Sequence, residues 1–285
     1  MNLENQFEKN LGNDEIYFNV DSDHLKKNIE FIVSNEIENI NLNPYKGYKL
    51  KNIDWVDSIA HIKRLEMGAC TEINLNGLSK LPLLEELVFT AEEKKQKVDM
   101  SHFKKIKTLS FGFNENIVGL ESLEKLERLS VWSANTSFLN EKYFEKYKKL
   151  SYLMLVQLKS SISLEFLKEN HHLQELEIQH CKTEIDLTGL EKLKDSFKKL
   201  KITSSKKIKN IELISKLKNL QSLILVDSVP IESVDLIKSL PHLDTLSLYG
   251  SSSVNDGNLQ GLKNQFKNLN IQPKKHYLYP EWYKK

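Results

Sequence analysis

The chain has 285 residues, of which 40% are hydrophobic and 28% are charged, with 10 glycines and 6 prolines. This balance is typical of a folded globular protein and excludes a disordered or fibrous chain. The 41 basic and 39 acidic residues leave a formal charge of +2, and only Arg64 and Arg128 are arginines, so the composition does not favour a nucleic acid or an anionic membrane as the partner.

The N-terminal residues 1–6 lack the basic and apolar regions of a secretory signal peptide, and no segment approaches 18 uninterrupted apolar residues. Two cysteines in the whole chain suit a reducing compartment. We therefore expect a cytoplasmic protein, although proteins exported by specialised secretion machines need not carry a signal peptide either.

One pattern recurs along the chain: an apolar residue, two variable residues, an apolar residue, one variable residue and a third apolar residue. The central apolar residue of each copy is Ile40, Leu65, Leu87, Leu109, Leu129, Leu153, Leu176, Leu200, Leu223, Leu246 or Leu269. Self-similarity at a nearly constant period of 20–25 residues is the signature of a repeat architecture. The sequence therefore predicts about eleven tandem repeats, each with one strand.

These copies resemble the leucine-rich repeat, whose units run 20–29 residues and open with L-x-x-L-x-L-x-x-N/C. The resemblance covers roughly residues 35–272. At the ninth position of the motif, where the family has an Asn or Cys that hydrogen-bonds the backbone of the next turn, this chain has Cys70, Asn114, Cys181, Ser205, Ser228 and Ser251. Some repeats are thus similar to the cysteine-containing subclass, whereas Glu92 and Leu158 depart from it.

The resemblance implies an α/β fold, a leucine-rich-repeat solenoid. Its curved parallel sheet would form the concave face, and short helices or 3₁₀ turns, as at residues 77–81, 119–123 and 189–193, would form the convex face. We divide the chain into an N-terminal cap at residues 1–35, a repeat array at 36–272 and a C-terminal cap or tail at 273–285.

Both ends of the array are expected to be capped, because a terminal repeat would otherwise expose its core. Asp23 precedes Leu25, Ile29 and Ile32 at helical spacing, which predicts an amphipathic helix with Asp23 as its N-cap. The tail contains Tyr277, Tyr279, Trp282 and Tyr283. These aromatic residues either cap the last repeat or bind a partner.

The residue types that perform catalysis are present but poorly placed for it. His180 and Cys181 are adjacent, yet Cys181 occupies the structural turn position, and about five repeats separate it from Cys70, too far for a disulfide. His61, His172 and His242 share one register with Asn219, which indicates a turn role and not a metal site. We therefore predict no enzyme activity, no metal and no cofactor. The segments 92–97 and 204–207 are interpreted as solvated charged loops.

Side chains alternate along a strand, so the residues before, between and after the buried leucines should face solvent on the concave side. This register predicts an exposed apolar patch of Trp132, Tyr152, Met154 and Val156 beside Arg128, a composition typical of interface hot spots. An acidic pair and a basic pair follow, and then three further apolar positions; these are Glu175 and Glu177, Lys199 and Lys201, and Ile224, Val226 and Tyr249. The charged residues either bind a partner or pair with one another across strands, Glu175 with Lys199 and Glu177 with Lys201.

From the resemblance we expect a non-catalytic protein that binds a partner protein on its concave face. A narrower hypothesis is an intracellular inhibitor or immunity protein that holds a toxin or enzyme, and we expect a monomer. The alternatives are an effector or adaptor that recruits a cellular protein and, with less support, a nucleic-acid binder that uses lysines.

Overall fold

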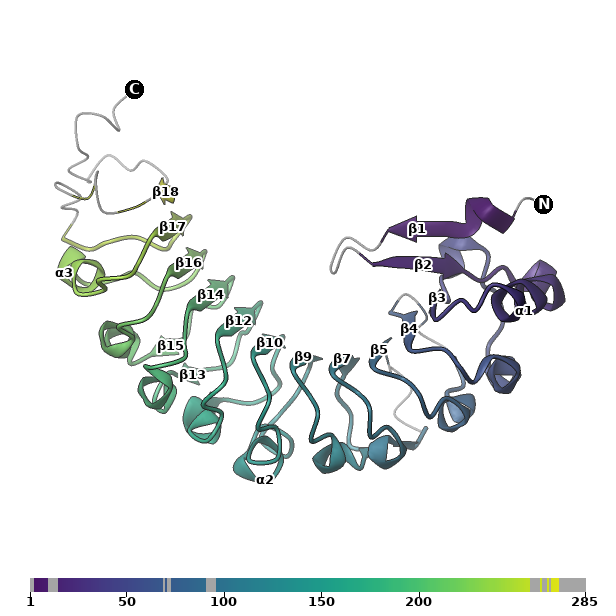
Figure 1. The fold of residues 1–285 in the computed structure, drawn as a ribbon. Helices are drawn as coiled ribbons and strands as arrows, with labels where there is room; N and C mark the ends of the chain where they lie inside the picture. The colour runs from purple at the N-terminus through teal and green to yellow at the C-terminus, as the bar shows by residue number, and fades with distance from the viewer. Residues whose placement is uncertain are drawn as a thin grey trace. The chain divides into compact units, whose positions relative to one another are not determined.

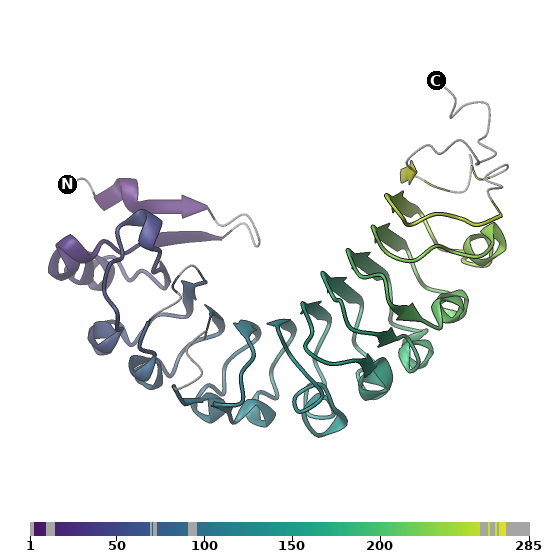
Figure 2. The ribbon, with the colours of Figure 1, turned by 180° about the vertical axis from the view of Figure 1, so that it is seen from behind.

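The structure is a computed structural model that describes residues 3–9, 15–68, 70, 73–90, 96–256, 262, 266 and 268–271. The chain divides into two compact units, Met1–Val131 and Trp132–Lys285. In each unit the strands of the main sheet line one side, and most of the short helices line the opposite side (Figures 1 and 2). The aromatic tail residues Tyr277, Tyr279, Trp282 and Tyr283 lie outside the described residues, as do residues 92–95 of the first predicted charged loop.

Every predicted strand is present, and each begins at the residue expected to precede the central apolar position. In the first unit the strands of the main sheet are β1 (Phe7–Lys9), β2 (Ile16–Asn19), β3 (Asn39–Asn41), β4 (Arg64–Met67), β5 (Glu86–Phe89), β7 (Thr108–Gly112) and β9 (Arg128–Trp132), whose last residue belongs to the second unit. In the second unit they are β10 (Tyr152–Val156), β12 (Glu175–Gln179), β14 (Lys199–Thr203), β16 (Ser222–Val226), β17 (Thr245–Tyr249) and β18 (Asn268–Ile271). The strands of the second unit pair in parallel with aligned registers, Leu153 opposite Leu176 and Leu176 opposite Leu200.

The sheet separates buried from solvent-facing side chains as the alternation predicts. In β14 and β16 the central and third apolar residues are buried, and the other three side chains of each strand are partly exposed. Burying a leucine or isoleucine contributes about 1.5–3 kcal/mol, and one repeat alone has no partner surface to bury against. The leucine columns therefore hold successive repeats together.

The remaining elements are short helices and minor strands, most of which lie on the side opposite the sheet (Figure 1). The helices of the first unit are α1 (Leu25–Ser34), η1 (Leu3–Gln6), η2 (Ser22–His24), η3 (Pro44–Lys46), η4 (Asp54–Ile59), η5 (Asn76–Lys80), η6 (Met100–His102) and η7 (Leu120–Ser122). Those of the second unit are α2 (Glu141–Phe144), α3 (Val234–Lys238), η8 (Leu164–Leu167), η9 (Leu190–Leu193) and η10 (Ile211–Lys216). The minor strands are β6 (Val98–Asp99) and β8 (Ile117–Val118) in the first unit and β11 (Ile162–Ser163), β13 (Ile185–Asp186) and β15 (Ile208–Lys209) in the second. The 3₁₀ turns predicted at residues 77–81, 119–123 and 189–193 are confirmed by η5, η7 and η9.

Successive repeats approach each other closely at glycines at or near the start of these turns. Gly189 has a φ of 102°, and a Cβ added there would lie 2.5 Å from the Cα of Glu165 in the preceding repeat. A side chain would clash with backbone, which cannot move aside as a flexible side chain can. Glycine is therefore required by both conformation and packing at this position.

In the second unit, the residue that directly follows a strand recurs in the left-handed conformation. The φ angles of Ser133, Gln157, His180, Ser204, Asp227 and Gly250 lie between 46° and 62°. This conformation costs a non-glycine residue about 1–2 kcal/mol. In return, the backbone amide donates to the next repeat, as from His180 to the Thr203 carbonyl at 2.9 Å and from Ser204 to the Val226 carbonyl at 2.8 Å. The turn after each strand thus continues the hydrogen-bonded ladder of the sheet.

The small polar residues at the ninth position satisfy buried backbone groups. The Cys70 thiol donates to the Leu42 carbonyl at 3.0 Å, and the Ser228 hydroxyl donates to the Ser205 carbonyl at 2.8 Å. The Ser251 hydroxyl makes the equivalent bond, to the Ser228 carbonyl at 3.0 Å, but Ser251 is exposed. The buried position of this turn belongs to Ser252, whose hydroxyl accepts from the Ser228 amide. The left-handed Gly250 precedes Ser252 by two residues, whereas the left-handed Asp227 directly precedes Ser228, so this turn is one residue longer.

The N-terminal cap differs from the prediction in two respects. Strand β2 joins the sheet in parallel with β3, Phe18 opposite Ile40, and β1 pairs antiparallel with β2, so a hairpin precedes the helix. Helix α1 begins at Leu25, but the capping carboxylate is Asp21, which accepts from the Asp23 amide and so caps the 3₁₀ turn η2. The prediction of Asp23 as the cap was therefore wrong. Because η2 precedes α1, the first backbone amides that need a cap belong to η2, and the capping residue lies two positions before Asp23.

Candidate functional site

The solvent side of strands β10, β12, β14, β16 and β17 forms a continuous surface of the second unit, here called the open face. Its side chains come from alternate positions of five aligned strands, so neighbours across the face are set by register. Met154 lies opposite Glu177, Glu177 opposite Lys201, and Lys201 opposite Ile224. The predicted site residues of these strands are thereby placed side by side.

The centre of the open face is an internally paired charge network. The Lys201 ammonium lies 2.9 Å from a Glu177 carboxylate oxygen, and the Lys199 ammonium lies 3.2 Å from Glu175 and 3.9 Å from Glu177. The Gln179 side-chain amide donates to Glu177 at 3.0 Å and to the Met154 sulfur at 3.5 Å. Of the two alternatives left open by the sequence, the structure thus has cross-strand pairing.

Apolar side chains lie on both sides of this network. Tyr152 and Met154 on β10 are partly exposed, as are Ile224 and Val226 on β16. Tyr249 on β17 lies opposite Val226 and is 40% exposed. The open face therefore presents two apolar groups separated by a neutralised polar strip.

Two of the residues predicted to be exposed are buried. Val156 is only 6% exposed and Glu177 only 7%. Val156 is the last residue of β10, and its backbone carbonyl accepts from the Ser133 amide of the neighbouring turn at 2.9 Å. Glu177 is covered by the two lysines and the glutamine that bind it. The expectation that these two side chains offer surface to a partner was wrong.

The remaining residues of the predicted patch belong to β9. Trp132 is partly exposed and precedes the Ser133 turn beside Val156. Arg128 is exposed, but it belongs to the first compact unit. Whether any of these residues contacts a partner stays a prediction.

The corresponding face of the first unit is occupied largely by its own polar side chains. Arg64 donates to the Asn39 side chain at 3.1 Å and lies 3.4 Å from Glu15 and 3.7 Å from Glu86. The Tyr17 hydroxyl, from the hairpin, donates to Glu86 at 3.0 Å. The hairpin that the sequence did not predict thus supplies groups that engage this face.

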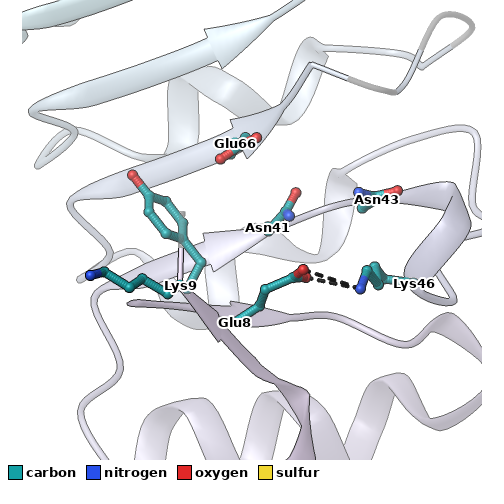
Figure 3. A pocket seen from close by; sticks show the side chains of 7 residues that line it. Glu8, Lys9, Asn41, Asn43, Lys46 and Glu66 are labelled. Atoms are coloured by element: carbon teal, nitrogen blue, oxygen red, sulfur yellow. Dashed lines mark hydrogen bonds and ion pairs between the residues drawn. The ribbon is translucent and has the colours of Figure 1, made fainter. Parts of the chain in front are cut away.

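A polar pocket of about 270 Å³ lies beside the hairpin (Figure 3). Its lining residues are Glu8, Lys9, Tyr17, Asn41, Asn43, Lys46 and Glu66. Hydrogen bonds from Lys46 and Asn19 hold the pKa of Glu8 below its usual value. Because charges of both signs line the pocket and its best-defined ion pair is internal, it selects no particular class of ligand.

The cysteines and histidines have the surroundings of structural residues. The Cys181 thiol is buried and donates to the Gln179 carbonyl at 3.3 Å, while His180 is exposed. Burial raises the pKa of Cys181 and raises that of Cys70 to about 11, so neither thiol is an activated nucleophile. Both cysteines are free.

The predicted turn role of the histidine column is confirmed only in part. His61 Nε2 lies 3.1 Å from the Ile37 carbonyl oxygen, and Asn219 donates to the Asp195 carbonyl at 3.0 Å. His172 and His242 are exposed at the same register. Within the part of the chain that the structure describes, no group of three or more His, Cys, Asp or Glu side chains is arranged to hold a metal, and no helix is long and apolar enough to cross a membrane.

Comparison with solved structures identifies the fold. The internalin InlF of Listeria monocytogenes superimposes with a TM-score of 0.52 at 15% identity, covering 90% of this chain and 82% of its own. A leucine-rich-repeat protein of Leptospira interrogans gives a TM-score of 0.50 at 15% identity and covers 82% of this chain and 71% of its own. The chain has a leucine-rich-repeat fold.

The likeness to these leucine-rich-repeat structures extends to the fold alone at this level of identity. No protein-family model matches the sequence. No curated protein matches it either. The open face of this leucine-rich-repeat sheet must therefore be interpreted from its own side chains.

Proposed function

We propose that this chain is a non-catalytic interaction module that binds a partner protein on the open face of its second unit. The observation that carries the proposal is the pair of partly exposed apolar groups, Tyr152 with Met154 and Ile224 with Val226 and Tyr249, on one face of the paired strands. Nothing in the packing of the repeats requires apolar residues at these solvent-facing positions. Aromatic residues and methionine, such as Tyr152, Met154 and Tyr249, are enriched at the centres of protein interfaces.

The charge network between the two apolar groups supports a protein partner. Its four charges sum to zero and already bind one another, so a partner need not neutralise them on contact. A partner surface that pairs apolar anchors with the two groups would leave the network intact and avoid the desolvation cost of unpaired charges.

The narrower proposal is that the partner is a toxin or enzyme and that binding inhibits it inside the cell. It is supported by the ion pairs and the hydrogen bond that link side chains of the open face to one another, because side chains held in place before binding lower the entropy cost of association and so favour a tight complex. The second candidate, an effector or adaptor that recruits a cellular protein, would use the same face.

The test is affinity capture from the native cell with the wild-type chain and with Tyr152→Ala, Trp132→Ala and Tyr249→Ala. The control is Tyr45→Ala, which removes the same kind of aromatic surface from the first unit, where Tyr45 is 88% exposed. Truncating an interface anchor typically costs about 2 kcal/mol or more, which corresponds to a loss of more than tenfold in affinity. We expect this loss for Trp132→Ala, Tyr152→Ala and Tyr249→Ala but not for Tyr45→Ala.

A specific partner captured equally well by all four variants would refute the placement of the site on the open face. If the captured partner is an enzyme, its activity in the complex separates the inhibitor from the adaptor. Binding to nucleic acid that falls steeply with salt and is unchanged in Tyr249→Ala would favour the nucleic-acid alternative.

A further inference from the structure

A column of lysines borders the open face where the strands end. Lys159, Lys182 and Lys206 each lie two residues beyond the left-handed turn residue of their repeat, which is Gln157, His180 or Ser204. Because the repeats stack in register, equivalent backbone positions are about 4.8 Å apart. The three lysines therefore form one row, and Lys207 adds a further positive charge at its end.

These lysines have no acidic partners within the part of the chain that the structure describes. Lys159, Lys182, Lys206 and Lys207 are all exposed and make no ion pair there. The lysines within the open face differ in this respect, because Lys199 and Lys201 each form an ion pair with a glutamate on the preceding strand. Like charges placed opposite one another in neighbouring repeats are destabilising, so these lysine charges do not stabilise the fold.

A pocket of about 390 Å³ lies within this row. It is lined by Gln157, Leu158, Lys159, His180 and Lys182. These side chains offer an anion donors and apolar surface, and the acceptors among them are the Gln157 side-chain carbonyl and one ring nitrogen of a neutral His180. The buried Leu158 contributes apolar surface, and no carboxylate lines the pocket. The pocket is therefore suited to a negatively charged group, such as a carboxylate, carried on a short side chain.

We propose that this lysine pocket binds an acidic segment of the partner protein, with carboxylates seated between Lys159, Lys182 and His180. This inference rests on the proposed function, because Gln157 and His180 directly follow the last residues of β10 and β12 and so place the pocket at the border of the open face. A protein that covers Tyr152 and Met154 would bring its adjoining segment onto the lysines.

An acidic peptide suits the pocket better than a nucleic acid does. The row contains no arginine for bidentate phosphate contacts, and the pocket lining contains no tyrosine, tryptophan or phenylalanine on which bases would stack. Ammonium groups bind carboxylates as point charges, without needing planar geometry. The chain's overall charge of +2 also supplies no wider field for a polyanion.

The test measures binding of a fluorescent decaglutamate peptide at low salt to the full chain and to two charge-matched double variants. Lys159→Gln with Lys182→Gln removes the pocket lysines. Lys192→Gln with Lys194→Gln removes two exposed lysines from the η9 region, which likewise have no ion pair among the described residues. An oligothymidylate of equal charge is the competing probe.

We expect the pocket variant to weaken peptide binding at least tenfold and the η9 variant to change it less than twofold. Equal weakening by both variants, or no peptide binding at all, would overturn the proposal, because the attraction would then be diffuse or absent. Tighter binding of the oligothymidylate, lost in the pocket variant, would overturn it in favour of nucleic acid.

The two proposals fail separately. If Tyr249→Ala loses the captured partner while the pocket variant retains both partner and peptide, the open face stands and the lysine pocket is wrong. If the pocket variant loses the peptide while Tyr152→Ala and Tyr249→Ala retain the partner, the pocket stands and the proposed function of the open face is wrong.

Discussion

Replacing Glu177 with glutamine tests whether the charge network organises the open face. Glu177→Gln preserves the size and one hydrogen-bond acceptor of the side chain but removes its charge. The wild-type carboxylate is bound by Lys201 at 2.9 Å, Gln179 at 3.0 Å and, more distantly, Lys199 at 3.9 Å. The substitution leaves Lys201 without a carboxylate partner and removes the negative charge that lies between the two lysines.

The expected loss follows from burial. Exposed ion pairs contribute about 0–1 kcal/mol to the free energy of unfolding, whereas breaking a buried pair costs about 3–5 kcal/mol. Glu177 is buried but its lysine partners are about one-third exposed, so we expect Glu177→Gln to lose about 1–2 kcal/mol. Glu175→Gln, whose side chain is 39% exposed and has one lysine partner, should lose about 0.5 kcal/mol or less.

Urea unfolding followed by circular dichroism measures both losses. The Glu175 effect should shrink in about 0.5 M salt because exposed charges are screened, while most of the Glu177 effect should persist. A double-mutant cycle with Lys201→Met isolates the Glu177–Lys201 pair. If Glu177→Gln is no more destabilising than Glu175→Gln, burial does not strengthen the Glu177 ion pairs, and the expected difference between the two variants is refuted.

Three further predictions concern the scaffold. Gly189→Ala should lower the free energy of unfolding by about 2–3 kcal/mol, because its Cβ would meet the backbone of Glu165 at a φ of 102°, and thermal unfolding measures the loss. Ser228→Ala should cost about 1–2 kcal/mol in urea unfolding, because the buried Ser205 carbonyl loses its donor. Burial raises the pKa of the Cys70 thiol from 9.0 to about 11, so the folded state favours the protonated thiol. This preference stabilises the fold fully below pH 9 and is lost as the pH rises toward 11. The free energy of unfolding of Cys70→Ser should therefore depend less on pH between 9 and 11 than that of the wild type.

Matched controls make these outcomes interpretable. Gly68→Ala should be mild, since its added Cβ meets only a Val88 methyl at 3.3 Å and its φ is not in the left-handed range. Equal losses for Gly189→Ala and Gly68→Ala would contradict the close-approach argument. A loss below about 0.3 kcal/mol for Ser228→Ala, or an unchanged pH dependence for Cys70→Ser, would contradict the assigned roles of those side chains.

The strand register and the small turn residues were predictable from the sequence, but the N-terminal hairpin was not. Apolar residues at the same spacing occur in every repeat, so a wrong register in one repeat would disagree with the register of all the others. The hairpin has no copy elsewhere in the repeat pattern, and β1 is only three residues long. The serine shift from Ser251 to Ser252 was missed for a similar reason, because a local turn that begins at Gly250 changes which residue enters the core.

The candidate site was predictable as a set of positions but not as an exposed surface. Counting from the leucines correctly placed Tyr152, Met154, Ile224 and Tyr249 on the solvent side of their strands. It placed Glu177 there too, but the lysines of the next strand bury it. The lysine row was interpreted only as a solvated loop at residues 204–207, because its other members are separated from that loop by whole repeats in the sequence.

The sequence by itself determined the repeat, the direction in which each strand side chain points and the columns that fill the core, since the apolar spacing allows one way of burying all the leucines together. Only the tertiary structure decided which solvent-side residues are actually exposed, that Glu175 and Glu177 pair with Lys199 and Lys201, and that the lysines beyond the strands have no such partners among the described residues. Those properties depend on what lies one repeat away, at a distance of about 4.8 Å in space and more than about twenty residues in the chain.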